Sequence, residues 1–519
     1  MSLVTSLSRC AVLGLVATTA CLDHARVPTE QAGRRAPALS AMTVSSAAPA
    51  TRTAAGTGRH IVSFAGAVPV DFAARVHALA GTVLWVSSGS GLATVSGLSG
   101  TAATRLAATR GIQTVDADAA IALDVPQVSA PDALGDGGAT SNANPAGAVR
   151  FARQWNMRAV QADAAWAHGF LGSSSVSIFM LDSGIDYLHA DLLGRVDLTR
   201  SVDLLGTFLA QAVVNQDTVI VPFTEADTVA KYFAGRQPFT DLFFHGTHTA
   251  ATVSSNAARA AGITSGTTLV AVKVCGYINV CPFSSILIGV IYAAQNGADV
   301  VNLSLGGGFP RAGNGRFVGL LQKVFNFARG KGVTIVVSAG NEAANLNRNG
   351  NVYETFCDTP GVICVSATGP TADATGLTTA TGPWTNIDAP AFYSNFGSAI
   401  DVAAPGGNES AGAPLPPPAF RGAFVWAGCS QTIYPPLAAR LGLNVCATSP
   451  RVIIGAEGTS MAAPHVTGTA ALLVSTLGRN PARIKARIEQ TADHIDKGGQ
   501  SLFYGHGRVN VARAVGAIP

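Results

Sequence analysis

From Trp155 onward, short runs of apolar residues alternate with longer stretches of helical pattern. The apolar runs lie at 176–181, 268–274, 300–305, 333–337, 362–365 and 400–403, and the candidate helices at 247–260, 285–295, 317–328 and 461–475. Strands that are apolar throughout and separated by helices are typical of a parallel sheet buried on both faces. The pattern therefore predicts an α/β fold, a doubly wound, mostly parallel sheet with helices on both faces, over residues 150–519.

A different pattern precedes this region. Between His60 and about residue 115 the expected order is strand, helix, strand, strand, helix, strand, which is the order of a split βαβ unit. We therefore predict a small α+β domain at 59–125. Residues 126–149 are rich in small and turn-forming residues and are expected to form an exposed linker.

Two segments interrupt the rhythm of the larger domain. They lie near 197–241 and near 407–452, and the second carries a proline-rich run. Neither continues the alternation of strand and helix, so we interpret both as surface insertions.

The first twenty-one residues have the pattern of an export signal. Arg9 precedes the apolar stretch 11–17, which ends in small residues before Cys21. The stretch is shorter than the about 20 apolar residues of a membrane span, so we predict a secreted protein with a flexible linker at 22–58. Small residues before a cysteine also resemble a lipoprotein signal, and a lipidated Cys21 would anchor the protein at the cell surface. Contact with a membrane is expected only in that case.

The composition excludes some classes of function. The 34 basic residues are balanced by 30 acidic ones and form no basic run, so nucleic acid is not an expected partner. Hydrophobic residues make up 48% of the chain and charged residues 12%, which is sufficient for a large folded core. A monomer is expected.

Six of the eight cysteines fall into three close pairs. Their short separations favour disulfides within each pair, and an oxidising compartment outside the cell would preserve them. The pairs are Cys275 with Cys281, Cys357 with Cys364, and Cys429 with Cys446. Free buried thiols or a zinc site are the alternatives, although no CxxC motif supports zinc.

Three residues with complementary acid–base chemistry stand at the ends of predicted elements. Asp182 follows the apolar run 176–181, while His245 and Ser460 each begin a helical stretch. Active sites of doubly wound sheets lie at the carboxyl ends of the strands. A serine hydroxyl becomes a nucleophile when an imidazole accepts its proton and a carboxylate orients that imidazole. Taken singly, Asp182 could be a loop cap and Ser460 a helix N-cap.

A metal site is a second interpretation of the histidines. His245 and His248 are three residues apart and could share one helix face, as in a metal-dependent hydrolase. The HExxH spacing and its glutamate are missing.

The segments around these residues resemble those of the subtilisin-like serine proteases, the subtilase family, over about residues 150–519. Asp182 stands in DSGID, His245 in HGTHTA and Ser460 in GTSMAAPHV, in the chain order of that family. The resemblance implies a serine endopeptidase that uses these residues as its catalytic triad, with no cofactor required for the chemistry. It also implies that Asn341, in VSAGNE, donates from its side chain to the oxyanion. A catalytically silent binding protein of the same fold is the alternative.

The resemblance extends to substrate binding. It implies that two segments bind protein or peptide substrates, one as an added strand and both as walls of the pocket for the residue before the cut. The residues concerned are Ser304, Leu305, Gly306, Gly307, Ser338, Ala339 and Gly340. The segments FYSNFG, 392–397, and YGHGRVN, 504–510, also resemble family segments.

Residues 59–125 resemble the family's propeptide, an intramolecular chaperone and inhibitor. The resemblance implies a zymogen that cleaves itself within the linker 126–149, or more broadly between about 120 and 150.

A structural calcium ion is a further expectation of the resemblance. Asp191, in HADL, matches one carboxylate ligand of the family, whereas the segment 254–261 looks shorter than the loop that often holds the ion. Calcium takes six to eight oxygen ligands, so Asp191 is a candidate ligand only.

Overall fold

The computed structural model describes residues 53–54 and 57–519, apart from 124, 130, 134–140, 215–216, 307–308, 311–314, 348–351, 354–355, 371–383, 410–422 and 497–500. The predicted export signal with Cys10 and Cys21, most of the linker 22–58, the proline-rich run and Gly307 lie outside the described residues. Within the described part of the chain, no helix combines the length and apolar character needed to cross a membrane.

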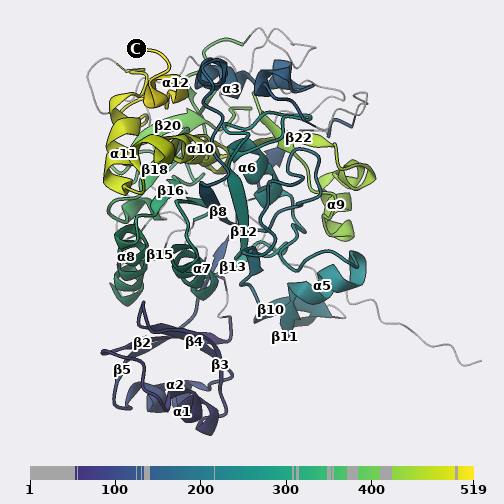
Figure 1. The fold of residues 1–519 in the computed structure, drawn as a ribbon. Coiled ribbons are helices and arrows are strands. Elements are labelled where there is room, and N and C mark those ends of the chain that lie inside the picture. The colour runs from purple at the N-terminus through teal and green to yellow at the C-terminus, as the bar shows by residue number, and fades with distance from the viewer. Residues whose placement is uncertain are drawn as a thin grey trace, which may run out of the picture.

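A mainly parallel sheet of eight strands forms the centre of the larger domain (Figure 1). Its order is β19-β18-β16-β14-β8-β12-β9, with β20 paired to β18. Among the described strands of this sheet, only β19 runs antiparallel to its neighbour. The strands are β8 (Ser177–Asp182), β9 (Val202–Asp203), β12 (Thr268–Lys273), β14 (Val300–Leu303), β16 (Thr334–Ser338), β18 (Ile363–Gly369), β19 (Ala389–Pro390) and β20 (Val402–Pro405).

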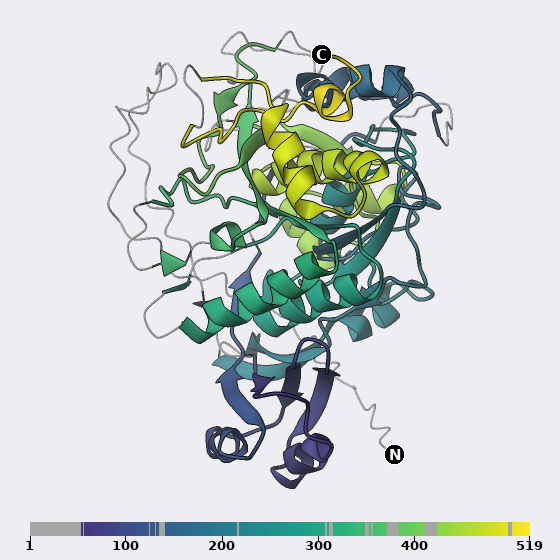
Figure 2. The same cartoon turned by 60° about the vertical axis from the view of Figure 1, so that its left-hand side comes forward.

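Helices cover both faces of this sheet, and alternate strand residues face two separate cores. Phe179 of β8 packs in the core that contains α7 (Phe283–Gln295) and α8 (Gly315–Gly330). Met180, its neighbour, packs in the core that contains α6 (His245–Val253), α10 (Thr459–Leu477) and α11 (Pro481–Gln490). Figure 2 shows the two helix layers on opposite sides of the sheet. The predicted α/β fold is therefore confirmed.

The ends of several elements differ from the predicted ranges. Helix α6 stops at Val253, because Ser254 adopts an extended backbone, so the predicted helix 247–260 is too long. Helix α10 begins two residues before the predicted range, at Thr459, and continues through Pro464. Further elements of the structure are β1 (Thr53–Ala54), α3 (Trp155–Ala159), α4 (Ala162–Ala167), β15 (Phe309–Pro310), β17 (Val352–Tyr353), α9 (Pro435–Leu441) and α12 (Val511–Val515).

The N-terminal domain is a four-stranded antiparallel sheet with two helices and its own core. Its elements follow the predicted order and are β2 (Arg59–Phe64), α1 (Phe72–Ala78), β3 (Thr82–Ser87), β4 (Leu92–Ser96), α2 (Gly100–Ala107) and β5 (Ile112–Ala117). The sheet lies against α7 and α8, with α1 and α2 on the far side (Figure 1). The Asp118 carboxylate accepts hydrogen bonds from the backbone N–H of Ser284, at 2.8 Å, and from its hydroxyl, at 2.6 Å, which joins the domain to the start of α7.

The segment near 197–241 contacts this N-terminal domain. It contains a hairpin of β10 (Thr207–Val214) and β11 (Asp217–Thr224), followed by α5 (Glu225–Tyr232). The Leu209 N–H donates to the Thr57 carbonyl at 2.9 Å. The Arg59 guanidinium donates to the backbone carbonyls of Leu205 and Thr207. This insertion therefore holds the first residues of the small domain.

The segment near 407–452 differs from the predicted surface insertion. It contains β21 (Val425–Gly428), whose four residues are buried and pair with β22 (Ile453–Glu457). Strand β22 leads directly into α10. Because β21 pairs with β22, it lies inside the domain and supports the start of that helix.

In the part of the chain that the structure describes, three disulfides are formed, Cys275–Cys281, Cys357–Cys364 and Cys429–Cys446. These are the three pairs that the short separations favour.

Candidate active site

Asp182 and His245 meet at the carboxyl edge of the sheet. Asp182 is the last residue of β8, and His245 is the first residue of α6. Asp182 Oδ1 lies 2.7 Å from His245 Nδ1, and both side chains are fully buried. Two residues 63 positions apart in sequence thus form one hydrogen-bonded pair.

Gly246 permits this close approach of the helix to the strand end. A Cβ atom at position 246 would lie 2.1 Å from the carbonyl oxygen of Gly184 and 3.2 Å from Cβ of Asp182. Any side chain there would push α6 away from β8. The glycine after the histidine is therefore a steric requirement of the pair.

Two further donors hold the Asp182 carboxylate. The Ser183 N–H donates to Oδ1 at 2.7 Å, and the Thr249 hydroxyl donates to Oδ2 at 3.1 Å. With the carboxylate fixed in this way, His245 donates its Nδ1 proton to Oδ1. The neutral ring then has its basic lone pair on Nε2.

Asp241 fixes the backbone that leads into His245, and sequence reasoning missed it. Its Oδ1 accepts the N–H groups of Phe243 and Phe244, at 2.9 and 3.1 Å, and its Oδ2 accepts the N–H and the hydroxyl of Thr247, at 2.9 and 2.6 Å. Phe244 has a φ of 126°, a strained conformation for a residue with a side chain. Burial raises the pKa of Asp241, while these donors act in the opposite direction. The sequence signal that could have indicated this role is the position of Asp241, four residues before His245.

Ser460 lies in the first turn of α10 and is bound to the segment that follows β14. Its hydroxyl donates to the Ser304 carbonyl at 3.0 Å, and the Ser304 hydroxyl donates to the Ser460 carbonyl at 2.9 Å. In this structure the hydroxyl proton is directed at Ser304, so its transfer to an imidazole requires the hydroxyl to rotate. The reciprocal pair places one residue of the predicted substrate-binding segment directly against the predicted nucleophile.

Asn341 lies beside the residue that precedes Ser460. Its Oδ1 accepts from the N–H and the hydroxyl of Thr459, at 2.8 and 2.9 Å. The Thr459 hydroxyl in turn accepts from the Gly340 N–H at 3.0 Å. The Asn341 side chain thus presents its Oδ1 to Thr459, and its Nδ2 amide is the donor end of the side chain.

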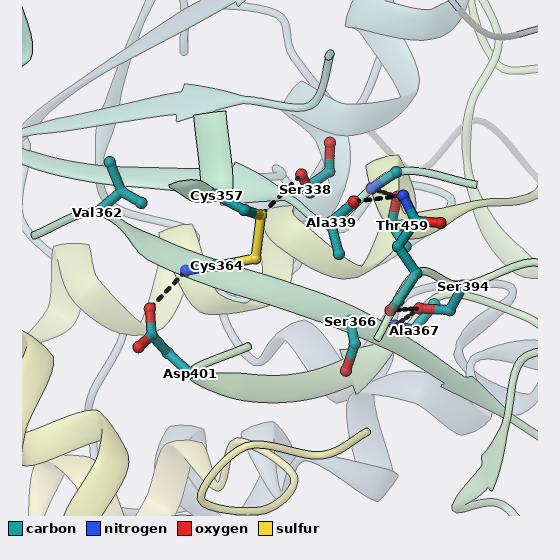
Figure 3. The surroundings of a disulfide bond; sticks show 12 residues. Ser338, Ala339, Cys357, Val362, Cys364, Ser366, Ala367, Ser394, Asp401 and Thr459 are labelled. Carbon is teal, nitrogen blue, oxygen red and sulfur yellow. Dashed lines mark hydrogen bonds between the residues drawn. A yellow bond between two sulfur atoms is a disulfide. The ribbon is translucent and has the colours of Figure 1, made fainter. Parts of the chain in front are cut away.

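A disulfide and a buried asparagine support the strand end that carries Asn341. Cys357–Cys364 lies beside Ser338 at the end of β16 (Figure 3), with Cys357 Sγ 3.5 Å from the Ser338 carbonyl oxygen. Asn395 donates to the Ala339 carbonyl at 2.9 Å and accepts from the Ala344 N–H at 2.8 Å. Asn395 stands in the segment FYSNFG, and that resemblance was its only sequence signal.

The comparison with known families agrees with this geometry. Residues 173–507, more than half of the chain, match the family model described as the subtilase family. The chain belongs to the subtilase family. It is therefore a serine protease of that family, and the fold described above is its subtilisin-like fold.

Individual relatives support the same assignment. This subtilase is 29% identical to thermitase of Thermoactinomyces vulgaris over 366 residues, 70% of this chain and 96% of thermitase. It is 27% identical to subtilisin of Bacillus pumilus over 362 residues, 68% of this chain and 96% of that protein. The crystal structure of the epidermin leader peptide processing serine protease from Staphylococcus aureus superposes with a TM-score of 0.63 at 20% identity, covering 89% of this chain and 98% of that one.

The second histidine of HGTH has a structural role in this subtilase. His248 is fully buried, and its Nε2 donates to the Val425 carbonyl at 3.1 Å, which ties α6 to β21. Burial lowers the pKa of His248 to about 3, so the ring is neutral near pH 7. Among the described residues, no group of three His, Cys, Asp or Glu side chains is arranged to hold a metal ion.

The surroundings of Asp191 do not fit a calcium ion. Its buried carboxylate accepts the N–H groups of Arg259 and Ala260, at 2.7 and 3.2 Å. These donors present positive partial charge to the carboxylate, whereas calcium requires several oxygen ligands around it. Gln154 is engaged with the same loop, because its Oε1 accepts the Ala261 N–H at 2.8 Å. The backbone of this loop therefore supplies hydrogen-bond donors to the Asp191 carboxylate.

Proposed function

We propose that this subtilase is a secreted serine endopeptidase, made as a zymogen, that hydrolyses peptide bonds through Asp182, His245 and Ser460. The observation that carries the proposal is the buried bond of 2.7 Å between Asp182 and His245 at the sheet edge. Ser460 stands at the start of the helix that packs against α6. This chemistry needs no cofactor, because the three side chains supply both the base and the nucleophile.

The reaction proceeds in two halves. His245 Nε2 accepts the Ser460 proton as the hydroxyl attacks the scissile carbonyl, and Asp182 stabilises the imidazolium that forms. The Asn341 side chain and the Ser460 N–H hold the oxyanion. The imidazolium then protonates the leaving amine, and water hydrolyses the acyl-enzyme by the same sequence of proton transfers.

The segments 304–307 and 338–340 are proposed to bind the peptide before the cut. Ser304, Leu305 and the segment 338–340 are buried or nearly so, and they flank the start of α10 through the bonds from Ser304 to Ser460 and from Gly340 to Thr459. An extended peptide added to such an edge is recognised mainly through its backbone. Protein and peptide substrates of broad sequence are therefore expected.

The N-terminal domain is proposed to be the inhibitory propeptide. After β5, the strand β6 (Ala120–Ala122) pairs antiparallel with β13 (Val280–Pro282), and the Leu123 N–H donates to the Asn279 carbonyl at 3.0 Å. The superposition with the Staphylococcus aureus protease covers 89% of this chain, more than residues 150–519 can account for. The fold of part of the N-terminal region is therefore shared with that protease.

Secretion is proposed from the N-terminal pattern together with the disulfides. Three disulfides persist best in an oxidising compartment. Detection of the processed protein in the culture medium, and its absence after deletion of residues 1–21, would test this part of the proposal.

A fluorophosphonate probe, which reacts with activated serines, tests the central claim. We expect covalent labelling of the wild-type protein, loss of labelling and of peptide hydrolysis in Ser460→Ala, and retention of both in Ser174→Ala, an exposed serine. Peptide binding without labelling would favour a silent binding protein. Hydrolysis that a chelator abolishes, again without labelling, would favour a metal-dependent hydrolase.

A further inference from the structure

The side chain of Arg59 reaches from the N-terminal domain into the larger domain. Arg59 is the first residue of β2, and it is 4% exposed. Its Nε and Nη2 donate to the Thr207 carbonyl, at 3.1 and 2.7 Å, and Nη2 also donates to the Leu205 carbonyl. Its Nη1 donates to the Ser285 hydroxyl at 3.1 Å. All three acceptor residues belong to the larger domain, and we name Leu205, Thr207 and Ser285 the guanidinium site.

Three neighbouring residues shape the turn of this site. Asp203 Oδ1 accepts the Leu205 N–H at 2.8 Å, which fixes the backbone of the turn. Gly206 has a φ of 55°, and a Cβ atom there would lie 3.3 Å from Nη2 of Arg59. Because glycine has no side chain, the guanidinium can approach this backbone closely. The ring of Phe208 lies on one side, with its centroid 5.9 Å from Arg59 Cζ.

The arrangement of the acceptors suits a guanidinium better than an ammonium group. A guanidinium presents its N–H donors in a rigid planar fork, which can bond two backbone carbonyls and a hydroxyl at the same time. The ammonium of a lysine is a compact charge without this fork. Burial lowers the pKa of Arg59, while Asp118 and Asp203 act in the opposite direction. An arginine nevertheless stays charged in proteins, so the site holds a cation.

Arg59 stands between two other contacts that join the domains. On one side, the Thr57 carbonyl accepts the Leu209 N–H at 2.9 Å. On the other side, the Arg59 carbonyl accepts the Asp118 N–H at 2.9 Å, and the Asp118 carboxylate accepts the Ser284 N–H. A shift of Arg59 therefore disturbs both contacts.

We propose that the insertion near 197–241 carries a binding site for an arginine side chain, and that its occupation by Arg59 sets how long the N-terminal domain stays on the protease. This inference rests on the proposed function, in which the N-terminal domain is the inhibitor. The guanidinium site adds the chemical class of the ligand, a planar cation, and the residue that supplies it. Release of Arg59 is then the step that controls the onset of activity.

The physical basis is that the hydrogen bonds of the site are broken together. Hydrogen bonds from a charged donor are stronger than those between neutral groups. The backbone of Arg59 is fixed in the sheet of its own domain, where it pairs with Ser96 of β4. The guanidinium is therefore carried by a rigid element, and separation of the domains breaks its bonds to the guanidinium site in one step.

Hydrogen exchange in the inactive Ser460→Ala chain measures opening of the interface without any catalysis. The reporters are the N–H groups of Leu209 and Ser284, which are bonded across the interface. We expect Arg59→Met to accelerate exchange at both by about tenfold or more, and Arg59→Lys by about fivefold or more, because an ammonium lacks the fork. Arg105→Met changes an exposed arginine on α2 of the same domain and should leave the exchange unchanged.

Gly206→Ala tests the site from the side of the larger domain, with Gly235→Ala as a matched control. Both glycines lie in the same insertion with a positive φ, 55° and 85°, but a Cβ atom at position 235 meets nothing within 4 Å. In the Ser460→Ala chain we expect Gly206→Ala to accelerate exchange at Ser284 by about threefold or more. Combined with Arg59→Met it should add nothing, because the guanidinium that it crowds is gone.

The purified active chain gives the regulatory readout. We expect Arg59→Met to shorten the delay before peptide hydrolysis begins by about tenfold, in proportion to the faster opening. Arg105→Met should keep the delay of the wild-type chain.

The outcomes separate the claims. Unchanged exchange in Arg59→Met would overturn the guanidinium site, and unchanged exchange in Arg59→Lys would overturn its preference for a planar cation. Equal acceleration in Gly206→Ala and Gly235→Ala would assign that effect to backbone strain and count against the site. An unchanged delay in Arg59→Met, with serine labelling intact, would overturn the regulatory role while leaving the protease function standing. Loss of fluorophosphonate labelling in the wild-type protein would instead contradict the proposed function itself.

Discussion

Nδ1 of His245 lies 2.7 Å from Oδ1 of Asp182, and both side chains are fully buried. Asp182→Asn keeps the shape of the side chain but presents an amide that can donate to the ring, and this favours the wrong imidazole tautomer. We expect kcat to fall by about 10⁴-fold, the loss known for this change in a related triad. Steady-state kinetics with a peptide substrate would measure it, and a loss below tenfold would contradict the assigned role.

Asn341→Ala should lower kcat by about 10²- to 10³-fold with little change in KM, because the side-chain donor acts on charge that develops in the transition state. Thr459→Val is the companion variant, since it removes the hydroxyl that bonds to Asn341 while retaining the Asn341 side-chain amide. The loss of kcat in this variant should stay within about tenfold, which corresponds to the free energy of one ordinary hydrogen bond. Equal losses in the two variants would show that Asn341 serves only to position Thr459.

Asp241→Asn tests whether the strained residue before His245 is held by a carboxylate. Asparagine has one acceptor atom where the aspartate uses two, so at least one donor of the loop loses its partner. We expect a loss of about 1–3 kcal/mol of stability together with a lower kcat, since His245 follows Phe244 directly. Asp197→Asn is the control, an aspartate that caps a surface turn in the same insertion. Chemical denaturation and kinetics of both variants would show whether the effect is specific to position 241.

Two buried histidines predict a loss of stability in acid. Burial lowers the pKa of His248 to about 3 and that of His465 to about 4, both from an ordinary value of 6.5. Below pH 6.5 the unfolded chain binds protons that the folded chain excludes. The contribution of each histidine to stability is therefore full above pH 6.5 and falls by about 1.4 kcal/mol per pH unit as the pH decreases, until about pH 4 for His465 and about pH 3 for His248.

Urea denaturation of the Ser460→Ala chain between pH 8 and pH 4 would measure this slope. His465→Gln should reduce it, because one of the two proton-binding differences is removed. A slope that is the same in both chains would contradict the neutral state of His465.

Asp191 should contribute to stability without calcium. Asp191→Asn is expected to destabilise the Ser460→Ala chain by about 1.5–3 kcal/mol, because a charged acceptor of backbone N–H groups is lost. Any shift of the unfolding midpoint on adding a chelator should be the same in the chains with and without Asp191→Asn. A chelator effect that disappears in Asp191→Asn would instead place a calcium ligand at this residue.

Local sequence determined much of the fold. Apolar strands such as 176–181 and 300–305 predicted the buried parallel sheet, because a strand covered on both faces has no polar side. The carboxyl ends of these strands then indicated where Asp182 would lie. The three short cysteine separations favoured the disulfides for a similarly local reason, since each disulfide closes only a short loop of chain.

Tertiary structure decided what depends on distant partners. The burial of Val425–Gly428 follows from pairing with β22, and that of Asp132 from arginines 18, 21 and 127 positions away. The use of Asp191 by a loop's N–H groups and the support of Phe244 by Asp241 are likewise invisible in the order of residues. Sequence patterns report the preference of each segment for water or for a core, whereas the partner of a buried charge is set by which segments the completed fold brings together.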